Sequence, residues 1–294
     1  MSSIIPIKQI MERLLSTSGQ TSNTVLHLSR VLSSAQGIEV SLCTLAYALA
    51  LLHSQLIRLL ERQYERIALS LTTLQTKTSS SLDDTIIPTL APPQTRLAEI
   101  CTSVRRSADL IEDFRIFLRL WNLLNIYAGA HELYRKTPRD PLIKFLRWTQ
   151  VGTDFAFQVL ENASYLAMKG ILRFKDERKA GRWMAWSCRF WLASVVLEGL
   201  RLARVRQLRY KDELMVLSEE GMEMKIDEKA VEVQSREIER QWWRDLWANA
   251  AWLPLTLHWS YEDETKSPMG EAMVGACGLV AGAVRFEEIW KETA

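Results

Sequence analysis

The chain has 294 residues and a mass of 33.9 kDa, enough for one large or two small domains with a substantial hydrophobic core. Its 48% of hydrophobic and 24% of charged residues exclude a disordered chain, and a net charge of +2 gives no indication of nucleic-acid binding. All 11 tryptophans lie between Trp121 and Trp290. Because the indole ring favours positions with one apolar and one wet side, this distribution indicates an interface or a membrane surface.

Helical periodicity recurs along the whole chain, and it predicts an all-α fold of long amphipathic and apolar helices in a membrane-associated bundle. In the N-terminal helical region, residues 1–75, leucines recur at steps of three and four from Leu42 to Leu59. This leucine seam predicts a bundle or coiled-coil contact, with a membrane-lying helix as the alternative. Residues 76–94 are rich in Ser, Thr and Pro, and we predict a linker there because proline interrupts helices.

An amphipathic and membrane-associated helical body is predicted over residues 95–211. Its first helix begins near Arg96, and steps of three and four place apolar side chains from Leu97 to Trp121 on one face. Two further helices, at 142–172 and 182–202, are predicted because no proline interrupts these long apolar stretches.

A change in charge marks the end of this body. Five basic residues fall between Arg201 and Lys211 with no acidic residue among them, and residues 212–240 are then predominantly acidic. We predict a charged helix or linker over 212–240. The last region, 241–294, combines a tryptophan-rich segment with a glycine-rich C-terminal helix.

The apolar stretches of the body and the C-terminus are poor candidates for membrane spans. Charged residues such as Glu161 and Arg189 interrupt the 142–172 and 182–202 helices. The run 269–284 is shorter than the roughly 20 residues that a spanning helix needs. We therefore expect no clean span, and predict helices that lie in the interface or polar residues that pair inside a bundle.

Residues with catalytic or metal-binding potential are scattered. The four histidines stand alone, and the four cysteines are separated by 58 residues or more, so neither forms a metal-ligand or redox motif. The chain contains no nucleophile elbow and no phosphate-binding loop. We therefore expect a protein that is not an enzyme, with no catalytic residue, no metal and no cofactor.

Three stretches together resemble the peroxin-11 family, and residues 253–260 resemble its divergent fungal members in particular. Residues 161–171 contain an acidic-Asn pair, an aromatic residue and a Lys-Gly pair. Residues 186–191 contain an Arg-aromatic-aromatic motif, and residues 275–290 resemble the family's glycine-rich final helix, which ends in a tryptophan.

The resemblance implies a peroxisomal membrane protein that promotes or regulates membrane elongation, proliferation and fission by inserting helices into one leaflet. Its implied partners are peroxisomal membrane lipids, copies of itself or related family members, and a dynamin-type fission machinery. The residues that we expect to contact the membrane are aromatic, leucine and arginine side chains of the helix that begins near Arg96, of the 182–202 helix and of the basic run: Arg105, Arg106, Phe114, Phe117, Leu118, Trp121, Trp183, Trp186, Arg189, Trp191, Arg201, Arg204, Arg206 and Arg209.

Two other functions remain open. A pore or channel for small metabolites could be lined by Asp154, Glu161 and Arg189. A soluble helical interaction scaffold could be built on the leucine seam of residues 42–59.

Overall fold

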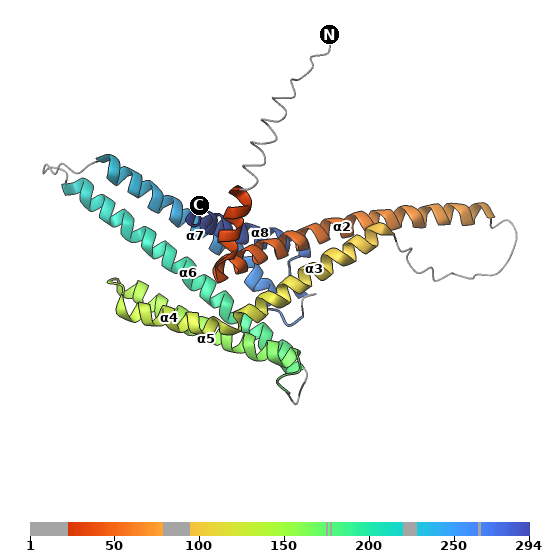
Figure 1. Ribbon diagram of the computed structural model, residues 1–294, viewed down its shortest axis with the longest axis horizontal. Coiled ribbons are helices and arrows are strands. Elements are labelled where there is room, and N and C mark those ends of the chain that lie inside the picture. Colours follow the sequence, from red (N-terminus) through yellow and green to blue (C-terminus); the bar gives the residue numbers. More distant parts are fainter. Residues whose placement is uncertain (1–22, 79–94, 175, 177, 220–227, 264–265) are drawn as a thin grey trace, which may run out of the picture.

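The computed structural model describes residues 23–78, 95–174, 176, 178–219, 228–263 and 266–294. The regular structure of these residues is helical, which confirms the all-α prediction (Figure 1). Residues 23–32 are helical and precede the labelled elements, which are α2 (Ala35–Thr78), α3 (Arg96–Leu118), the 3-10 helix η1 (Arg119–Trp121), α4 (Asn122–Arg135), α5 (Pro141–Met168), α6 (Arg178–Glu219), α7 (Glu228–Trp259) and α8 (Glu271–Glu292).

Side-chain caps explain where two of these helices begin. Asp140 accepts a hydrogen bond from the backbone N–H of Ile143 at 2.9 Å, and Pro141 occupies the first position of α5. Proline is favourable there because the first turn has no partner for its missing N–H. Thr95 caps α3 in the same way, accepting from the N–H of Ala98 at 3.2 Å.

The helices pack in a closed circuit (Figure 1). Helix α5 lies along α6, α6 along α7, α7 along α8, and α8 along α2. Helix α3 also packs against α2, and η1 leads it to α5, which α4 covers. This arrangement places α8, near the end of the chain, against α2, the first long helix.

Glycines of α8 allow a close approach to α2. A Cβ atom added at Gly275 would lie 2.8 Å from the backbone nitrogen of Leu51, and one at Gly278 would overlap the ring of Tyr47. Helices with small residues at such a spacing can bring their backbones together. Tyr47 is buried with Leu255 of α7, so the contact continues into a core that three helices share.

The leucine seam lies on another side of α2. Leu45, Leu52 and Leu59 are 47%, 47% and 51% exposed and the other three leucines of the seam are half-buried, while Cys43 and Tyr47 are buried. The closest packing of α2 is therefore through the face that meets the α8 glycines, and the seam takes part in packing only through its half-buried leucines. The reason is geometric, because the glycines allow the closest approach of backbones on that face.

One helix in the described residues is long and apolar enough to cross a membrane by length and composition. It is α2, over Ala35–Ser70, where residues 40–57 contain no Asp, Glu, Lys or Arg. The expectation of no clean span is corrected for this segment. The apolar window of this helix is 22% buried in the fold, where α2 packs against α3 and α8.

The predicted region boundaries stay predictions. Most of the predicted 76–94 linker, from residue 79 onward, lies outside the described residues. In the predicted charged segment, 212–219 belong to α6 and 228–240 to α7, and 220–227 lie outside the described part of the chain.

Candidate membrane-contact surface

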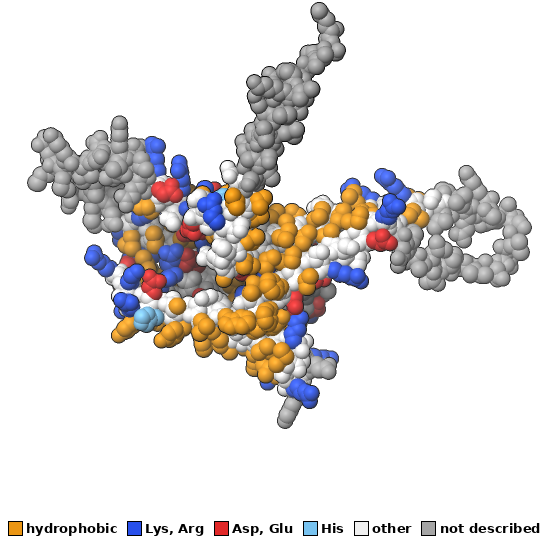
Figure 2. Space-filling model, viewed as in Figure 1, with side chains coloured by type: hydrophobic (Ala, Val, Ile, Leu, Met, Phe, Trp, Pro, Cys, Tyr) orange, Lys and Arg blue, Asp and Glu red, His pale blue; other side chains and the backbone are white. Residues whose placement is uncertain are grey.

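An apolar strip runs along the outer side of α3, η1 and α4. Its side chains recur at steps of three and four and are between 44% and 72% exposed: Leu110, Phe114, Phe117, Trp121, Leu124 and Tyr127. Figure 2 shows hydrophobic side chains gathered over this part of the molecule, below the centre of the view, where α3 meets α4 and α5. Contiguous exposed patches of this kind mark contact sites for proteins or membranes.

The opposite side of α3 faces the protein. Cys101, Ala108 and Arg115 are buried there, and α3 packs against α2. The expected single apolar face of this helix is therefore divided: Leu118 is half-buried, whereas Phe114 and Trp121 are exposed. The helix has apolar side chains on two sides, and the packing against α2 uses one of them.

Arginines at the N-terminal end of the strip have different surroundings. Arg106 lies four residues before Leu110 and so on the same face; it is exposed and makes no ion pair with a described residue. Arg105 contacts Asp109 at 2.9 Å and Glu271 at 2.8 Å. Of these two predicted membrane-contact residues, Arg106 therefore has its charge available to a lipid phosphate at the strip, whereas Arg105 is already paired.

A buried polar network holds the strip against α5. Arg119 of η1 pairs with Glu161 of α5, and Asn122 donates to Gln158 at 3.0 Å. Gln158 is fully buried and donates to Asn162 at 2.7 Å. The sequence predicts polar residues that pair inside a bundle, but not the pairs between η1 or α4 and α5, whose members lie 36 to 42 residues apart.

The predicted aromatic residues of α6 divide between surface and interior. Trp186 is 50% exposed, and the guanidinium of Arg189 lies 4.6 Å from the centre of its ring. Arg189 also donates to the carbonyl of Ser260 at 3.1 Å. Trp191 packs instead among aromatic rings of α7, with its centroid 5.7 Å from that of Trp259.

Trp183 lies near the start of α6. It is half-buried, 5.0 Å from the ring of Phe174, and the ammonium group of Lys179 lies 5.0 Å from its ring centre. The structure therefore does not bring Trp183, Trp186 and Trp191 together on one exposed face.

The four arginines of the predicted basic tail are half-buried and each has a carboxylate partner in the protein. Their contacts are Arg201–Glu198 at 2.5 Å, Arg204–Asp140 at 2.8 Å, Arg206–Glu239 at 2.6 Å and Arg209–Glu239 at 3.8 Å. The hydrogen bond from Arg204 lowers the pKa of Asp140 below its usual value. A role for these arginines at lipid phosphates stays a prediction, and it would require them to exchange partners.

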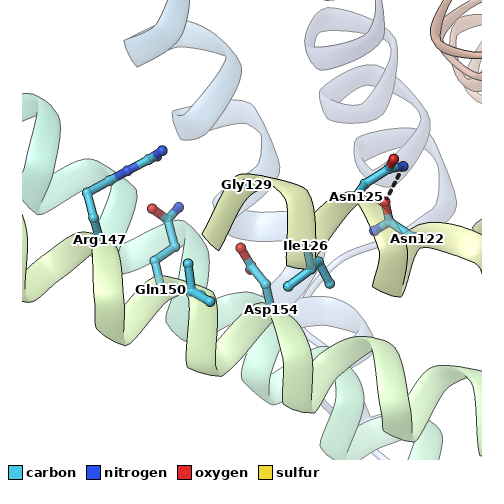
Figure 3. A pocket seen from close by; sticks show the side chains of 8 residues that line it. Asn122, Asn125, Ile126, Gly129, Arg147, Gln150 and Asp154 are labelled. Atoms are coloured by element: carbon cyan, nitrogen blue, oxygen red, sulfur yellow. Dashed lines mark hydrogen bonds between the residues drawn. The ribbon is translucent and has the colours of Figure 1, made fainter. Parts of the chain in front are cut away.

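The three residues suggested for a pore do not line one channel in the described structure. Glu161 is buried against Arg119, and Arg189 reaches Ser260. Asp154 lines a cleft between α4 and α5 (Figure 3), where burial raises the pKa of its carboxyl. Among the described residues no group of three or more His, Cys, Asp or Glu side chains could hold a metal ion.

Fold and surface together define an all-α protein with a large exposed apolar face. The model of the family described as Peroxisomal biogenesis factor 11 (PEX11) matches residues 94–290, more than half of the chain, and the chain belongs to this family. It is a peroxisomal membrane protein involved in peroxisome proliferation. The family is one of biogenesis factors and is not known as a family of enzymes.

No curated protein and no solved structure matches the chain. The family match covers α3 to α8 and begins after α2. The apolar strip and the buried network therefore lie within the family region, while the leucine seam precedes it.

Proposed function

We propose that this chain promotes or regulates peroxisome elongation and fission by inserting the apolar strip into one leaflet of the peroxisomal membrane. The observation that supports this function is the exposure of six apolar side chains along one continuous edge of α3, η1 and α4. From Leu110 to Tyr127 this edge is about 26 Å long at the rise of an α-helix. Insertion into one leaflet to a depth of about 5–10 Å widens that leaflet and favours curvature.

Apolar burial is the dominant driving force in this proposal. Each half-exposed Phe, Trp or Leu contributes about 1 kcal/mol when it leaves water, roughly half the value for a fully exposed side chain. A basic residue near an anionic surface contributes about the same. Six apolar side chains therefore outweigh Arg106, the exposed arginine on the face of the strip. We expect membrane binding to depend only weakly on salt and on anionic lipid.

The family supplies two further parts of the proposal. We infer that the chain associates with itself or with related family members, and that it works together with a dynamin-type fission machinery. The partners would act on membrane that the apolar strip has already curved.

The test uses full-length protein and vesicles with the lipid composition of peroxisomes. The double variant Phe117→Ser/Trp121→Ser removes two adjacent side chains of the strip, which are 44% and 57% exposed. We expect at least tenfold weaker flotation with vesicles and loss of vesicle tubulation.

A matched control keeps this test specific. Trp247→Ser/Leu253→Ser removes side chains of similar exposure, 60% and 43%, from α7. It should float and tubulate like the wild type, and circular dichroism should show unchanged helix content in both variants. Equal flotation of the strip variant and the wild type would contradict the proposal.

A further inference from the structure

A cleft of about 270 Å³ lies between α4 and α5, beside the apolar strip (Figure 3). Five of its eight lining residues are polar or charged, and the lining comes from both helices: Asn122, Asn125, Ile126, Gly129, Arg147, Gln150, Val151 and Asp154. Pockets for drug-sized molecules are usually 300–1,000 Å³. The cleft therefore has the size for a small polar group rather than for a whole lipid.

The charges of the cleft are separated along α5. Arg147 and Asp154 are two helical turns apart, roughly 10 Å along the axis, with Gln150 between them (Figure 3). Arg147 is exposed and makes no ion pair with a described residue. The neighbouring Glu198, which accepts from Gln150 at 3.4 Å, is already paired with Arg201. The cleft thus offers one cationic end and one carboxylate end.

We propose that this cleft binds the headgroup of a zwitterionic phospholipid, with the phosphate at Arg147 and the amino group at Asp154. A planar guanidinium suits phosphate oxygens, and a carboxylate accepts hydrogen bonds from an ammonium group. The inference rests on the proposed function, because the headgroup would come from the leaflet that receives the strip.

The lining favours ethanolamine over choline. Quaternary ammonium groups are recognised by aromatic cages, and none of the eight lining residues is aromatic. A primary ammonium can instead donate to the Asp154 carboxylate and to the side-chain carbonyl of Asn125 or Gln150. The lipid class that fits is phosphatidylethanolamine.

The surroundings of the cleft suit a lipid whose acyl chains stay in the leaflet. Tyr127 of α4 and Trp148 of α5, on the two helices that form the cleft, are 72% and 38% exposed. Aromatic rings of this kind favour the headgroup level of a bilayer. A headgroup in the cleft would therefore lie where these side chains meet the membrane surface.

The test titrates the full-length protein in detergent micelles with soluble headgroups by calorimetry. Glycerophosphoethanolamine should bind saturably, and glycerophosphocholine at least fivefold more weakly. Arg147→Gln should weaken both by at least fivefold. Asp154→Asn should abolish the preference for ethanolamine and keep phosphate binding. Arg139→Gln, an exposed arginine that does not line the cleft, should match the wild type.

Inorganic phosphate and vesicles distinguish the sources of the phosphate. If a lipid is the ligand, inorganic phosphate binds more weakly than glycerophosphoethanolamine, and vesicles with phosphatidylethanolamine bind more protein than vesicles with phosphatidylcholine alone. Equal binding of inorganic phosphate with no difference between vesicles would assign a free-phosphate site and overturn the proposal. Absence of saturable headgroup binding would overturn it as well.

Failure of this inference is separable from failure of the proposed function. The soluble headgroup needs no membrane insertion, so Phe117→Ser/Trp121→Ser should keep glycerophosphoethanolamine binding. A protein that tubulates vesicles but binds no headgroup would refute the cleft proposal alone.

Discussion

Arg119 of η1 and Glu161 of α5 form a two-point ion pair, with Nη2–Oε1 at 2.7 Å and Nε–Oε2 at 3.1 Å. The Glu161 side chain is only 5% exposed and also accepts from Gln158 at 3.1 Å. A buried carboxylate is costly without a cation and hydrogen-bond donors. The pair therefore fixes η1 on α5 and, with it, the direction in which Phe117 and Trp121 project.

Removing one member of this pair should cost more than removing both. The single variants Glu161→Met and Arg119→Met each leave the other charged side chain without its partner, and we expect each to lose about 3 kcal/mol in unfolding free energy. The double variant Arg119→Met/Glu161→Met should lose much less, because neither charge is then buried. Denaturant unfolding in detergent measures both. A double variant as unstable as the sum of its two single variants would contradict a direct coupling.

Two of the three stretches that resemble the PEX11 family contact other parts of the family region through polar side chains. Glu161 of the acidic-Asn pair holds Arg119, and Asn162 donates to the carbonyl of Leu120 at 3.2 Å. Arg189 of the Arg-aromatic-aromatic motif donates to the carbonyl of Ser260, the residue directly after α7. The similarity therefore has a structural basis, because these residues set how the helices of the body pack.

Helix positions in the body could be predicted from local patterns. A helix beginning near Arg96 was expected and α3 begins there, and the expected 142–172 helix corresponds to Pro141–Met168. Periodicity and proline are local signals, so one sequence suffices for them.

The choice of packing face depends on distant partners and could not be predicted. Both sides of α3 are apolar, and Phe114 and Leu118 were assigned to the same face although only Leu118 turns inward. The carboxylate partner of Arg204 lies 64 residues away at Asp140. A basic run therefore suggested a free cationic tail, while the fold supplies acidic side chains to each of its arginines.

The contact between α8 and α2 gives a stability prediction. Gly275→Ala places a Cβ atom 2.8 Å from the nitrogen and 3.0 Å from the Cα of Leu51, and backbone atoms cannot rotate away. Overpacking of this kind should lower the unfolding free energy by about 1–3 kcal/mol. Gly152→Ala is the control, since its Cβ meets open space within α5 and should stabilise by up to about 1 kcal/mol. Thermal unfolding compares them, and an equal melting temperature would argue against close α2–α8 packing.

The Asp140–Arg204 pair predicts an acid-sensitive contact between α5 and α6. The pKa of Asp140 is lowered in the fold, so its pairing stabilises the protein above the unfolded pKa of about 3.9 and is lost as pH falls through the folded value. Asp140→Asn keeps the helix cap but loses the charge. It should melt below the wild type at pH 7, and the difference should shrink below about pH 4.

The control for this pH profile is an exposed ion pair. Asp176 and Arg182 lie 2.5 Å apart with both side chains 51% exposed, so Asp176→Asn should change the melting temperature little. A wild-type advantage over Asp140→Asn that persists unchanged to pH 3 would exclude ionisation of Asp140 as its cause.

Glu239 restrains two arginines of the basic tail. Its carboxylate contacts Arg206 at 2.6 Å and Arg209 at 3.8 Å. Glu239→Gln removes the negative charge that would compete with lipid phosphates for these arginines. The amide oxygen can still accept a hydrogen bond from the indole N–H of Trp243. If the arginines serve lipid phosphates, binding to anionic vesicles should tighten on the order of fivefold, as expected for one further available basic residue.

Glu237→Gln controls for the overall charge in this experiment. It changes the net charge by the same amount, but Glu237 is 61% exposed and pairs with Arg240 and Arg244 rather than with the tail. Vesicle co-sedimentation at two salt concentrations compares the variants. Equal effects of the two substitutions would assign the gain to net charge and not to release of the tail.

Two tryptophans give opposite expectations for lipid contact. Trp121 is 57% exposed on the apolar strip, whereas the centroid of Trp191 is 5.1 Å from Trp252 and 5.7 Å from Trp259. Brominated acyl chains quench only indoles that reach the leaflet. Trp121→Phe should therefore remove part of the quenchable emission of full-length protein on vesicles, and Trp191→Phe should leave that part unchanged. The reverse pattern would mean that the rings of α6 and α7 separate in the membrane and that the strip stays in water.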